Sequence, residues 1–260
     1  MTNNIVPATY VKGGIDPSFC VGEAWELIKR RPWLYIGAAL VLMVFNLIPY
    51  LGILLSGPIM GGFVYLVLND IRRQPVDFGM IFKGFGRFGK LILLGLIQAF
   101  PAILVQAFQA FLEIRAYLSQ GSAPADSTFF QDTPDVIGFG NEVTIAFIVV
   151  MIGYWLFLIF WGWAMLFAIP LIVEYDAKVL EAVTLSFGAA FNNVGGVIVL
   201  GLYGGVIALL GVLALCVGVF VAAPVILASN VIAYRQVFPS LLNDEFDGTA
   251  GTTGGSIFGL

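Results

Sequence analysis

A long apolar run between residues 32 and 73 constrains this chain more than any other feature. No charged side chain lies in residues 33–67, although roughly 20 residues are enough to cross the hydrocarbon of a bilayer. Prolines and glycines between Pro49 and Pro58 interrupt the helical pattern of this run. The run therefore predicts a membrane hairpin that turns near these prolines. Lysine and arginine residues at both of its ends place those ends in the cytoplasm.

The composition excludes a soluble fold. Hydrophobic residues make up 60% of the chain and charged residues only 11%, whereas soluble domains average about 25% charged residues. Histidine, the commonest metal ligand and general base, is missing from the sequence. Cys20 and Cys216 stand far apart without a CxxC motif, and we interpret both as unpaired thiols. The glycines of residues 84–89 match GxGxxG but lack a βαβ context. We therefore expect no metal centre and no cofactor.

The rest of the chain extends the first hairpin into an all-α polytopic bundle. Two further apolar runs follow it, and the charge-free stretch 194–233 predicts a second hairpin with its bend between Gly211 and Pro224. Six spans would place both termini in the cytoplasm (N-in, C-in). The expected spans cover about 33–52, 54–69, 91–112, 143–173 and the two arms of 194–233. The expected domains are a cytoplasmic leader (1–22), a membrane domain (23–238) with an outer loop (119–142), and an acidic, then Gly/Thr-rich cytoplasmic tail (239–260).

The distribution of charge supports this topology. Eleven of the twelve lysine and arginine residues fall on the expected cytoplasmic side, and Arg115 is the exception. The expected outer segment combines Arg115 with an excess of aspartate and glutamate. Because cytoplasmic loops of membrane proteins are enriched in basic residues, this asymmetry predicts a multi-pass membrane protein whose basic segments face the cytoplasm.

Two amphipathic segments, residues 78–90 and 174–193, are expected to lie at the membrane surface as interfacial helices. In the first segment, an α-helical pattern places large apolar side chains on one arc and cations opposite. That arc comprises Phe78, Ile81, Phe82, Phe85 and Phe88. Each glycine in this segment weakens an isolated helix by about 1 kcal/mol, so we expect contact with membrane or protein to hold it.

Basic side chains near the first hairpin and the first amphipathic segment are predicted to contact anionic lipids of the cytoplasmic leaflet. Such lipids attract polybasic segments close to the membrane surface. The predicted lipid-contacting residues are Lys29, Arg30, Arg31, Arg72, Arg73, Lys83, Arg87 and Lys90. Membrane lipids are therefore the first partners that the sequence predicts.

A polar stripe follows one face of the third expected span. Its members recur at helical spacing, and they are Gln98, Gln106, Gln109 and Glu113. Polar side chains at membrane depth line a hydrophilic path for a solute, or they form hydrogen bonds between helices. We favour the second interpretation. A continuous wet cavity along the three glutamines would instead indicate a transporter.

Glycines in the second hairpin predict close packing of helices, because small residues let helix backbones approach each other. Gly201 and Gly205 form a GxxxG motif, and Gly211 belongs to a series that recurs every seven residues. Packing within the chain is favoured over dimerisation, and a homo-oligomer is left open.

Three acidic residues, Glu174, Asp176 and Glu181, follow the fourth expected span. They are expected to be paired with cations or solvated, and ligation of a metal cation is the less favoured alternative. The candidate pairing partners are Arg72, Arg73 and Lys83.

Three stretches of the chain carry a resemblance to a known group of proteins. They are residues 22–42 (GEAWELIKRRPWLYIGAALVL), residues 56–97, which include Gly57-Pro58 and the Phe82-x-x-Phe85 segment, and residues 220–238 (FVAAPVILASNVIAYRQVF). In these stretches the chain resembles uncharacterised bacterial six-span integral membrane proteins. That family is similar to the membrane domain that accompanies some glycerophosphodiester phosphodiesterases. The resemblance implies a six-span helical inner-membrane protein, and it carries neither an active site nor the phosphodiesterase activity.

The function that these features favour is that of a non-enzymatic accessory, assembly or envelope-organising subunit. Such a subunit acts through helix packing and contacts with anionic lipids, and other membrane proteins are its expected partners. The alternative is a small-solute or lipid transporter that uses Gln98, Gln106 and Gln109. An intramembrane enzyme acting on lipid is a third, less favoured option. No nucleic-acid partner is expected.

Overall fold

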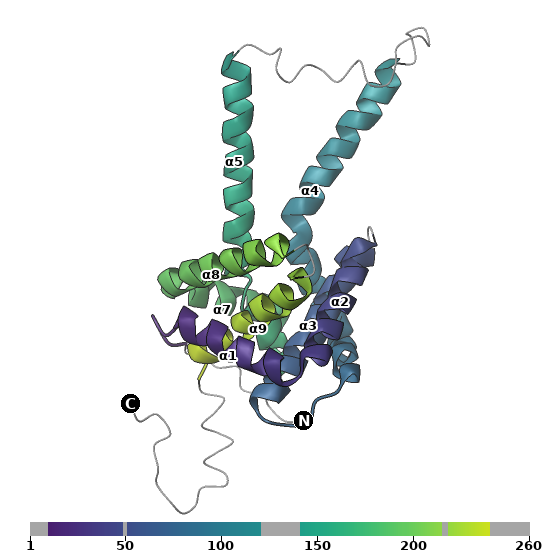
Figure 1. Cartoon of the computed structure of the whole chain (residues 1–260). Helices are drawn as coiled ribbons and strands as arrows, with labels where there is room; N and C mark the ends of the chain where they lie inside the picture. Colours follow the sequence, from purple (N-terminus) through teal and green to yellow (C-terminus); the bar gives the residue numbers. More distant parts are fainter. Residues whose placement is uncertain (1–9, 49–50, 121–140, 215–217, 240–260) are drawn as a thin grey trace, which may run out of the picture. The chain divides into compact units, whose positions relative to one another are not determined.

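The computed structural model describes residues 10–48, 51–120, 141–214 and 218–239, and every regular element in those ranges is helical. Cys216 and nearly all of the expected outer loop and tail lie outside the described residues. In chain order (Figure 1), the elements are α1 (Pro17–Arg30), α2 (Pro32–Leu47), α3 (Leu51–Ile71), the 3₁₀ helix η1 (Phe78–Arg87), α4 (Phe88–Gln120), α5 (Asn141–Ala164), α6 (Ala168–Tyr175), α7 (Val179–Asn192), α8 (Val194–Leu213) and α9 (Val219–Val237).

Among the described residues, five helical runs are long and apolar enough to cross a membrane. They are Leu54–Ile71, Phe78–Arg115, Ile148–Tyr175, Val194–Leu213 and Val219–Val237. The first expected span corresponds to α2, whose 16 residues fall short of the roughly 20 that a spanning helix needs. The chain is therefore an all-helical membrane protein with five candidate spans in its described part. The sixth span and the N-in, C-in orientation stay predictions.

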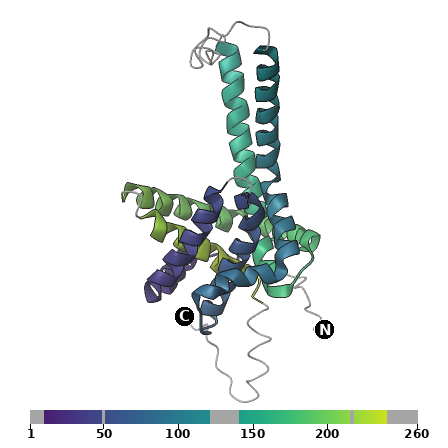
Figure 2. The same ribbon diagram turned by 90° about the vertical axis from the view of Figure 1, so that its right-hand side faces the viewer.

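The chain divides into two compact units. The core unit contains the described residues of 1–96 and 164–260, and the α4–α5 unit contains residues Ile97–Trp163. In the core unit, α2 packs with α3, α8 packs with α9, and α1 lies alongside α9 (Figures 1 and 2). In the α4–α5 unit, the indole N–H of Trp161 donates a hydrogen bond to the carbonyl oxygen of Gln98 (3.1 Å). The two helices of this unit therefore meet at the Trp161 end of α5.

Helix α1 begins at Pro17, so it includes the last part of the expected leader. A carboxylate oxygen of Asp16 accepts hydrogen bonds from the backbone N–H groups of Ser18 (3.0 Å) and Phe19 (3.1 Å). Proline is tolerated in the first turn because the N–H that it lacks would have no partner there. The buried residues of α1 recur every three or four positions and form the face next to α9. They are Cys20, Ala24, Leu27 and Ile28.

The Cys20 thiol is predicted to be unreactive in the folded protein. Burial, assisted by the nearby Asp16 charge, raises the pKa of this thiol to about 12, and its sulfur lies 3.3 Å from Oε1 of Gln236. Because the thiolate is the nucleophile, we expect maleimide at about pH 8 to modify Cys20 roughly a thousandfold more slowly in the folded than in the unfolded chain. Mass spectrometry of a Cys216→Ser variant, with and without denaturant, measures this ratio. Equal rates in the two states would contradict the burial of Cys20.

The segment before α1 belongs to the core unit as well. The backbone N–H of Val11 donates a hydrogen bond to the carbonyl oxygen of Val237 (2.9 Å). Asn193, at the junction of α7 and α8, accepts a hydrogen bond from the N–H of Gly14 (3.1 Å) and donates one to the carbonyl oxygen of Val11 (3.0 Å). Part of the expected leader is thus hydrogen-bonded to the helices at both of these places.

Glycines allow η1 to lie directly on α3. A Cβ atom on Gly62 of α3 would lie 1.6 Å from the carbonyl oxygen of Ile81, and one on Gly84 of η1 would lie 1.9 Å from the carbonyl oxygen of Pro58. Neither position has room for a side chain. Ile81 is fully buried at this contact, so protein contact holds the glycine-rich segment against α3.

The 3₁₀ geometry of η1 corrects the expected α-helical arc. With three residues per turn, side chains three positions apart lie above one another. Ile81 and Gly84 therefore form the buried ridge against α3, while the phenylalanines at positions 82, 85 and 88 form a separate ridge. Asp77 starts the helix by accepting a hydrogen bond from the N–H of Gly79 (2.7 Å). The predicted single apolar face is thus divided into a protein-facing ridge and an aromatic one.

The fourth expected span is divided into two helices, α5 and α6, by a turn at residues 165–167. Pro170 gives a physical reason, because proline lacks an N–H and its ring clashes with the carbonyl group four residues earlier. The buried hydroxyl of Ser186 on α7 bonds to the backbone at this turn. It accepts a hydrogen bond from the N–H of Phe167 (3.1 Å) and donates one to the carbonyl oxygen of Ala164 (2.6 Å).

Candidate functional site

A buried carboxylate, that of Glu174 near the end of α6, is bound by three side chains from two other parts of the chain. Its Oε1 accepts hydrogen bonds from the guanidinium groups of Arg72, just after α3, and Arg235 of α9 (2.9 Å for Arg235). Its Oε2 accepts a hydrogen bond from the hydroxyl of Tyr234 (2.9 Å). Only 6% of the Glu174 side chain and 7% of the Arg235 side chain are exposed. We call these four residues the Glu174 cluster, and it connects α3, α6 and α9.

The Glu174 cluster contains more positive than negative charge. Two guanidinium groups share one carboxylate, and Nε of Arg72 and Nε and Nη2 of Arg235 are buried without a hydrogen-bond partner. Removing charges from water costs several kcal/mol per ion unless opposite charges and hydrogen bonds compensate. Glu174 supplies that compensation for both arginines. The cluster can therefore hold three helices in register, and its chemistry is that of a structural ion pair.

A second buried polar contact joins α2 to α3. The hydroxyl of Tyr35 donates a hydrogen bond to Oδ2 of Asp70 (2.7 Å). Tyr35 is fully buried and also packs edge-to-face on Phe63, with ring centroids 6.3 Å apart. The contact satisfies a carboxylate at the buried end of α3 and fixes α2 against it.

Two ion pairs meet at Asp176, the residue that caps the C-terminus of α6. Oδ1 of Asp176 lies 3.1 Å from Nε of Arg87 and 2.9 Å from Nζ of Lys90, and Nζ also donates a hydrogen bond to the Asp176 carbonyl oxygen (2.6 Å). The hydrogen bond from Lys90 and its positive charge, followed by the hydrogen bond and charge of Arg87, lower the pKa of the Asp176 carboxyl group. Asp176 has a left-handed backbone conformation (φ 55°). We call these three residues the Asp176 cluster.

The structure places the eight predicted lipid-contacting cations in different environments. Lys29 pairs with Glu26 (2.7 Å) and Arg30 with Glu23 (3.9 Å). The guanidinium of Arg31 donates a hydrogen bond to the carbonyl oxygen of Val76 (3.2 Å). The other five lie as follows: Arg72 in the Glu174 cluster, Arg73 at a positive φ of 57°, Lys83 over the ring of Tyr65 at 5.8 Å, and Arg87 and Lys90 in the Asp176 cluster. Their contact with lipid stays a prediction.

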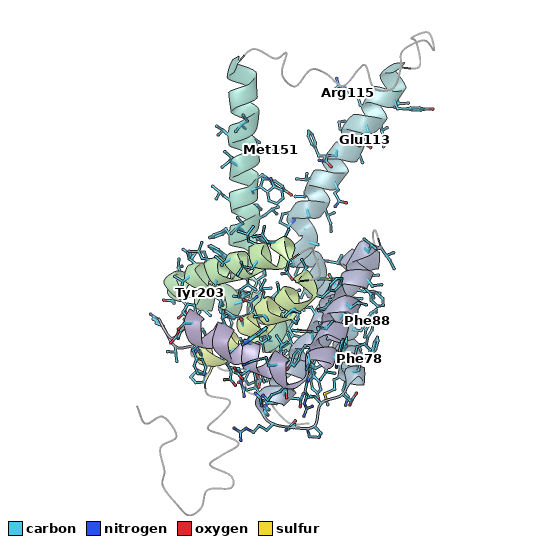
Figure 3. All side chains as sticks on the ribbon, in the orientation of Figure 1. Phe78, Phe88, Glu113, Arg115, Met151 and Tyr203 are labelled. Carbon is cyan, nitrogen blue, oxygen red and sulfur yellow. The ribbon has the colours of Figure 1, made fainter. Side chains whose placement is uncertain are left out.

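The predicted polar stripe lies on the exposed surface of α4. Gln98, Gln106, Gln109 and Glu113 are all exposed, and Figure 3 shows Glu113 beside Arg115 on this helix. The backbone carbonyl of Gln98 accepts the hydrogen bond from Trp161. The structure thus assigns these side chains neither to a lined cavity nor to a dry core.

The predicted packing glycines divide between two faces of α8. Gly211 is buried, and a Cβ atom there would lie 2.9 Å from Cβ of Ala222 on α9. Gly201 and Gly205 are exposed, and a Cβ atom on Gly205 would meet nothing within 4 Å. Close packing inside the α8–α9 hairpin therefore involves Gly211, whereas the GxxxG motif faces outward from it.

Sequence reasoning included Glu174 and Asp176 but missed most of their partners. Arg72 is one of the predicted partners of the acidic residues, whereas Arg235 and Tyr234 are not among them. The pairing of Tyr35 with Asp70 was not predicted. One feature of the sequence could have indicated these pairings. The ionisable residues stand directly at the ends of apolar runs, where a charge is partly desolvated and needs a partner.

Fold and site together define an all-helical integral membrane protein whose helices are joined by buried and half-buried ion pairs. Among the described residues, no group of three His, Cys, Asp or Glu side chains could hold a metal ion. No family model matches the chain, and neither curated proteins nor solved structures give a match. The resemblance to uncharacterised six-span membrane proteins therefore stays a prediction.

Proposed function

We propose that this chain is a non-enzymatic subunit of the bacterial inner membrane with an accessory, assembly or envelope-organising role. It acts through helix packing and contacts with anionic lipids. The observation that carries the proposal is the use of its charged groups. Glu174 connects α3, α6 and α9, and Asp176 connects α6 with η1 and the start of α4. Side chains paired in this way connect helices to one another, as a role based on helix packing requires.

Helix α8 offers a surface for such a role. Its exposed apolar side chains include Leu202, Val206 and Leu209, each more than half exposed, and Tyr203 is labelled on the same helix in Figure 3. Apolar surface on a membrane helix is covered by lipid or by another helix, and small residues favour the second by permitting close approach. Gly201 and Gly205 lie on this exposed part of α8.

Site-specific photo-crosslinking tests the proposal. A photoreactive residue at Leu209 is expected to crosslink one defined membrane protein as well as lipid in native membranes. The same residue at Val231, which is 1% exposed on α9, is the control and should crosslink only within the chain. Crosslinks to lipid alone from exposed positions on all helices, together with purification as a lone monomer, would contradict a subunit role. Solute flux in proteoliposomes that is lost on Gln106→Leu and Gln109→Leu substitution would replace the proposal with the transporter.

A further inference from the structure

A row of three phenylalanine rings, with its two ends exposed, runs along η1 into the start of α4. The ring centroids of Phe82 and Phe85 are 6.3 Å apart, and those of Phe85 and Phe88 are 5.8 Å apart and nearly parallel. Phe82 is 47% exposed and Phe88 is 42% exposed. We call these three residues the phenylalanine ladder. Figure 3 labels Phe88, its last ring.

The ladder and the Asp176 cluster come from the same stretch of chain. In η1, side chains three residues apart form ridges, and the ridge of Phe82, Phe85 and Phe88 lies beside the one that continues from Gly84 to Arg87. Lys90 follows two residues after Phe88. Arg87 and Lys90 share the single carboxylate of Asp176, which leaves one positive charge uncompensated. The side chains of Arg87, Lys90 and Asp176 are 32%, 37% and 50% exposed. An accessible cationic group therefore adjoins an accessible apolar strip.

We propose that the phenylalanine ladder and the Asp176 cluster form one binding site for an anionic phospholipid. The lipid phosphate is bound by Arg87 and Lys90, and an acyl chain lies along the rings of the ladder. This inference rests on the lipid contacts of the proposed function and assigns them to one site. Arginine is suited to phosphate because its guanidinium N–H groups match the phosphate oxygens in pairs.

The ladder decides between a lipid and a soluble anion. A free phosphate would use only the cations, and the exposed rings of Phe82 and Phe88 would stay in contact with water. A phospholipid covers both parts of the site at once, because its charge and its apolar chains lie next to each other. In this arrangement Asp176 is a competitor of the phosphate for the same two cations, as well as a positioning residue for them.

Removal of the competing carboxylate gives the sharpest test. Asparagine keeps the size of the native aspartate side chain, and it tolerates the left-handed backbone conformation found at this position. We expect Asp176→Asn to bind phosphatidylglycerol about fivefold more tightly, since one charge near anionic lipid is worth about a factor of five. The double variant Arg87→Gln, Lys90→Gln is expected to bind it at least about tenfold more weakly. Lys178→Gln, an exposed cation two residues beyond Asp176, is the matched control and should change nothing.

The measurement is native mass spectrometry of the purified full-length chain in detergent, titrated with phosphatidylglycerol and, separately, with phosphatidylcholine. The ladder is tested by Phe82→Ser with Phe88→Ser, which should weaken phosphatidylglycerol binding, against Phe19→Ser, an exposed phenylalanine on α1. Thermal unfolding of each variant confirms that it is folded. Glycerol phosphate in place of lipid is expected not to bind, and binding as strong as that of lipid would mean a soluble-anion site and overturn the proposal.

The outcomes separate this site from the wider function. If the unaltered chain prefers phosphatidylglycerol but folded Asp176→Asn binds it no more tightly, the site is wrong while the lipid contacts of the proposed function stand. If the unaltered chain binds both lipids equally, those lipid contacts fail as well. A gain in Asp176→Asn together with losses in the arginine–lysine and phenylalanine variants supports the site.

Discussion

Gly62→Ala is expected to abolish the packing of η1 on α3 and to leave little folded protein. The added Cβ atom would lie 1.6 Å from the carbonyl oxygen of Ile81 and 2.8 Å from its Cα atom. Both are backbone atoms, so no side-chain rotation relieves the clash. Overpacking of a tight contact typically costs 1–3 kcal/mol, and a backbone clash of this kind should cost about 3 kcal/mol or more. The yield of monodisperse protein and its thermal unfolding temperature in detergent measure the loss.

Gly86→Ala, in η1 on the other side of this contact, is the matched control. A Cβ atom at Gly86 would meet nothing within 4 Å. Alanine is better than glycine in a helix by about 1 kcal/mol, so this variant should be as stable as the native chain or slightly more stable. Similar unfolding temperatures for Gly62→Ala and Gly86→Ala would show that η1 does not lie on α3 as described.

The helical class and most candidate spans could be predicted because hydropathy and length decide them. The run 194–233 contains no charge. Its described part forms α8, which ends at Leu213, and α9, which begins at Val219. The interruption in the first hairpin was expected between Pro49 and Pro58, and α3 in fact continues through Pro58. Pro58 is the eighth residue of α3, where proline usually kinks or breaks a helix. The position of a proline therefore did not locate the turn.

The form of η1 and the division between α5 and α6 could not be read from periodicity. An arc of five apolar residues in residues 78–88 is compatible with an α-helix, and only the contact of Gly62 and Gly84 with opposing carbonyl groups shows which ridge faces the protein. Likewise, Pro170 is visible in the apolar run, but the turn between α5 and α6 also depends on Ser186 of another helix. The Ser186 hydroxyl both accepts and donates a hydrogen bond to the backbone at this turn. Both features depend on contacts between elements.

The partners of the acidic residues could not be predicted from the sequence for a related reason. Glu174 and Arg235 are 61 residues apart in the chain. Charge alone does not indicate which of several cations pairs with a carboxylate. The packing of α3, α6 and α9 decides the pairing. The sequence could therefore indicate that Glu174 and Asp176 need cations, while the choice of Arg235 for one and of Arg87 with Lys90 for the other follows from the fold.

Glu174→Gln is expected to destabilise the folded chain by about 3–5 kcal/mol, the usual cost of removing one partner from a buried ion pair. Glutamine keeps the shape of the side chain but removes the negative charge that compensates Arg72 and Arg235. Burial makes the effect large, because Arg235 is only 7% exposed and already has unpartnered nitrogen atoms. The free energy of unfolding, from denaturant titration in mixed micelles with helicity as the signal, measures the change.

Two further variants show whether that loss comes from uncompensated charge. Glu181→Gln, on exposed surface of α7, removes the same charge and should change the free energy of unfolding by less than about 0.5 kcal/mol. Adding Arg235→Gln to Glu174→Gln removes the buried cation as well, so the double variant should be more stable than the sum of the two single losses predicts. Strictly additive losses, or a loss for Glu174→Gln no larger than that for Glu181→Gln, would mean that the Glu174 cluster does not hold α3, α6 and α9 together.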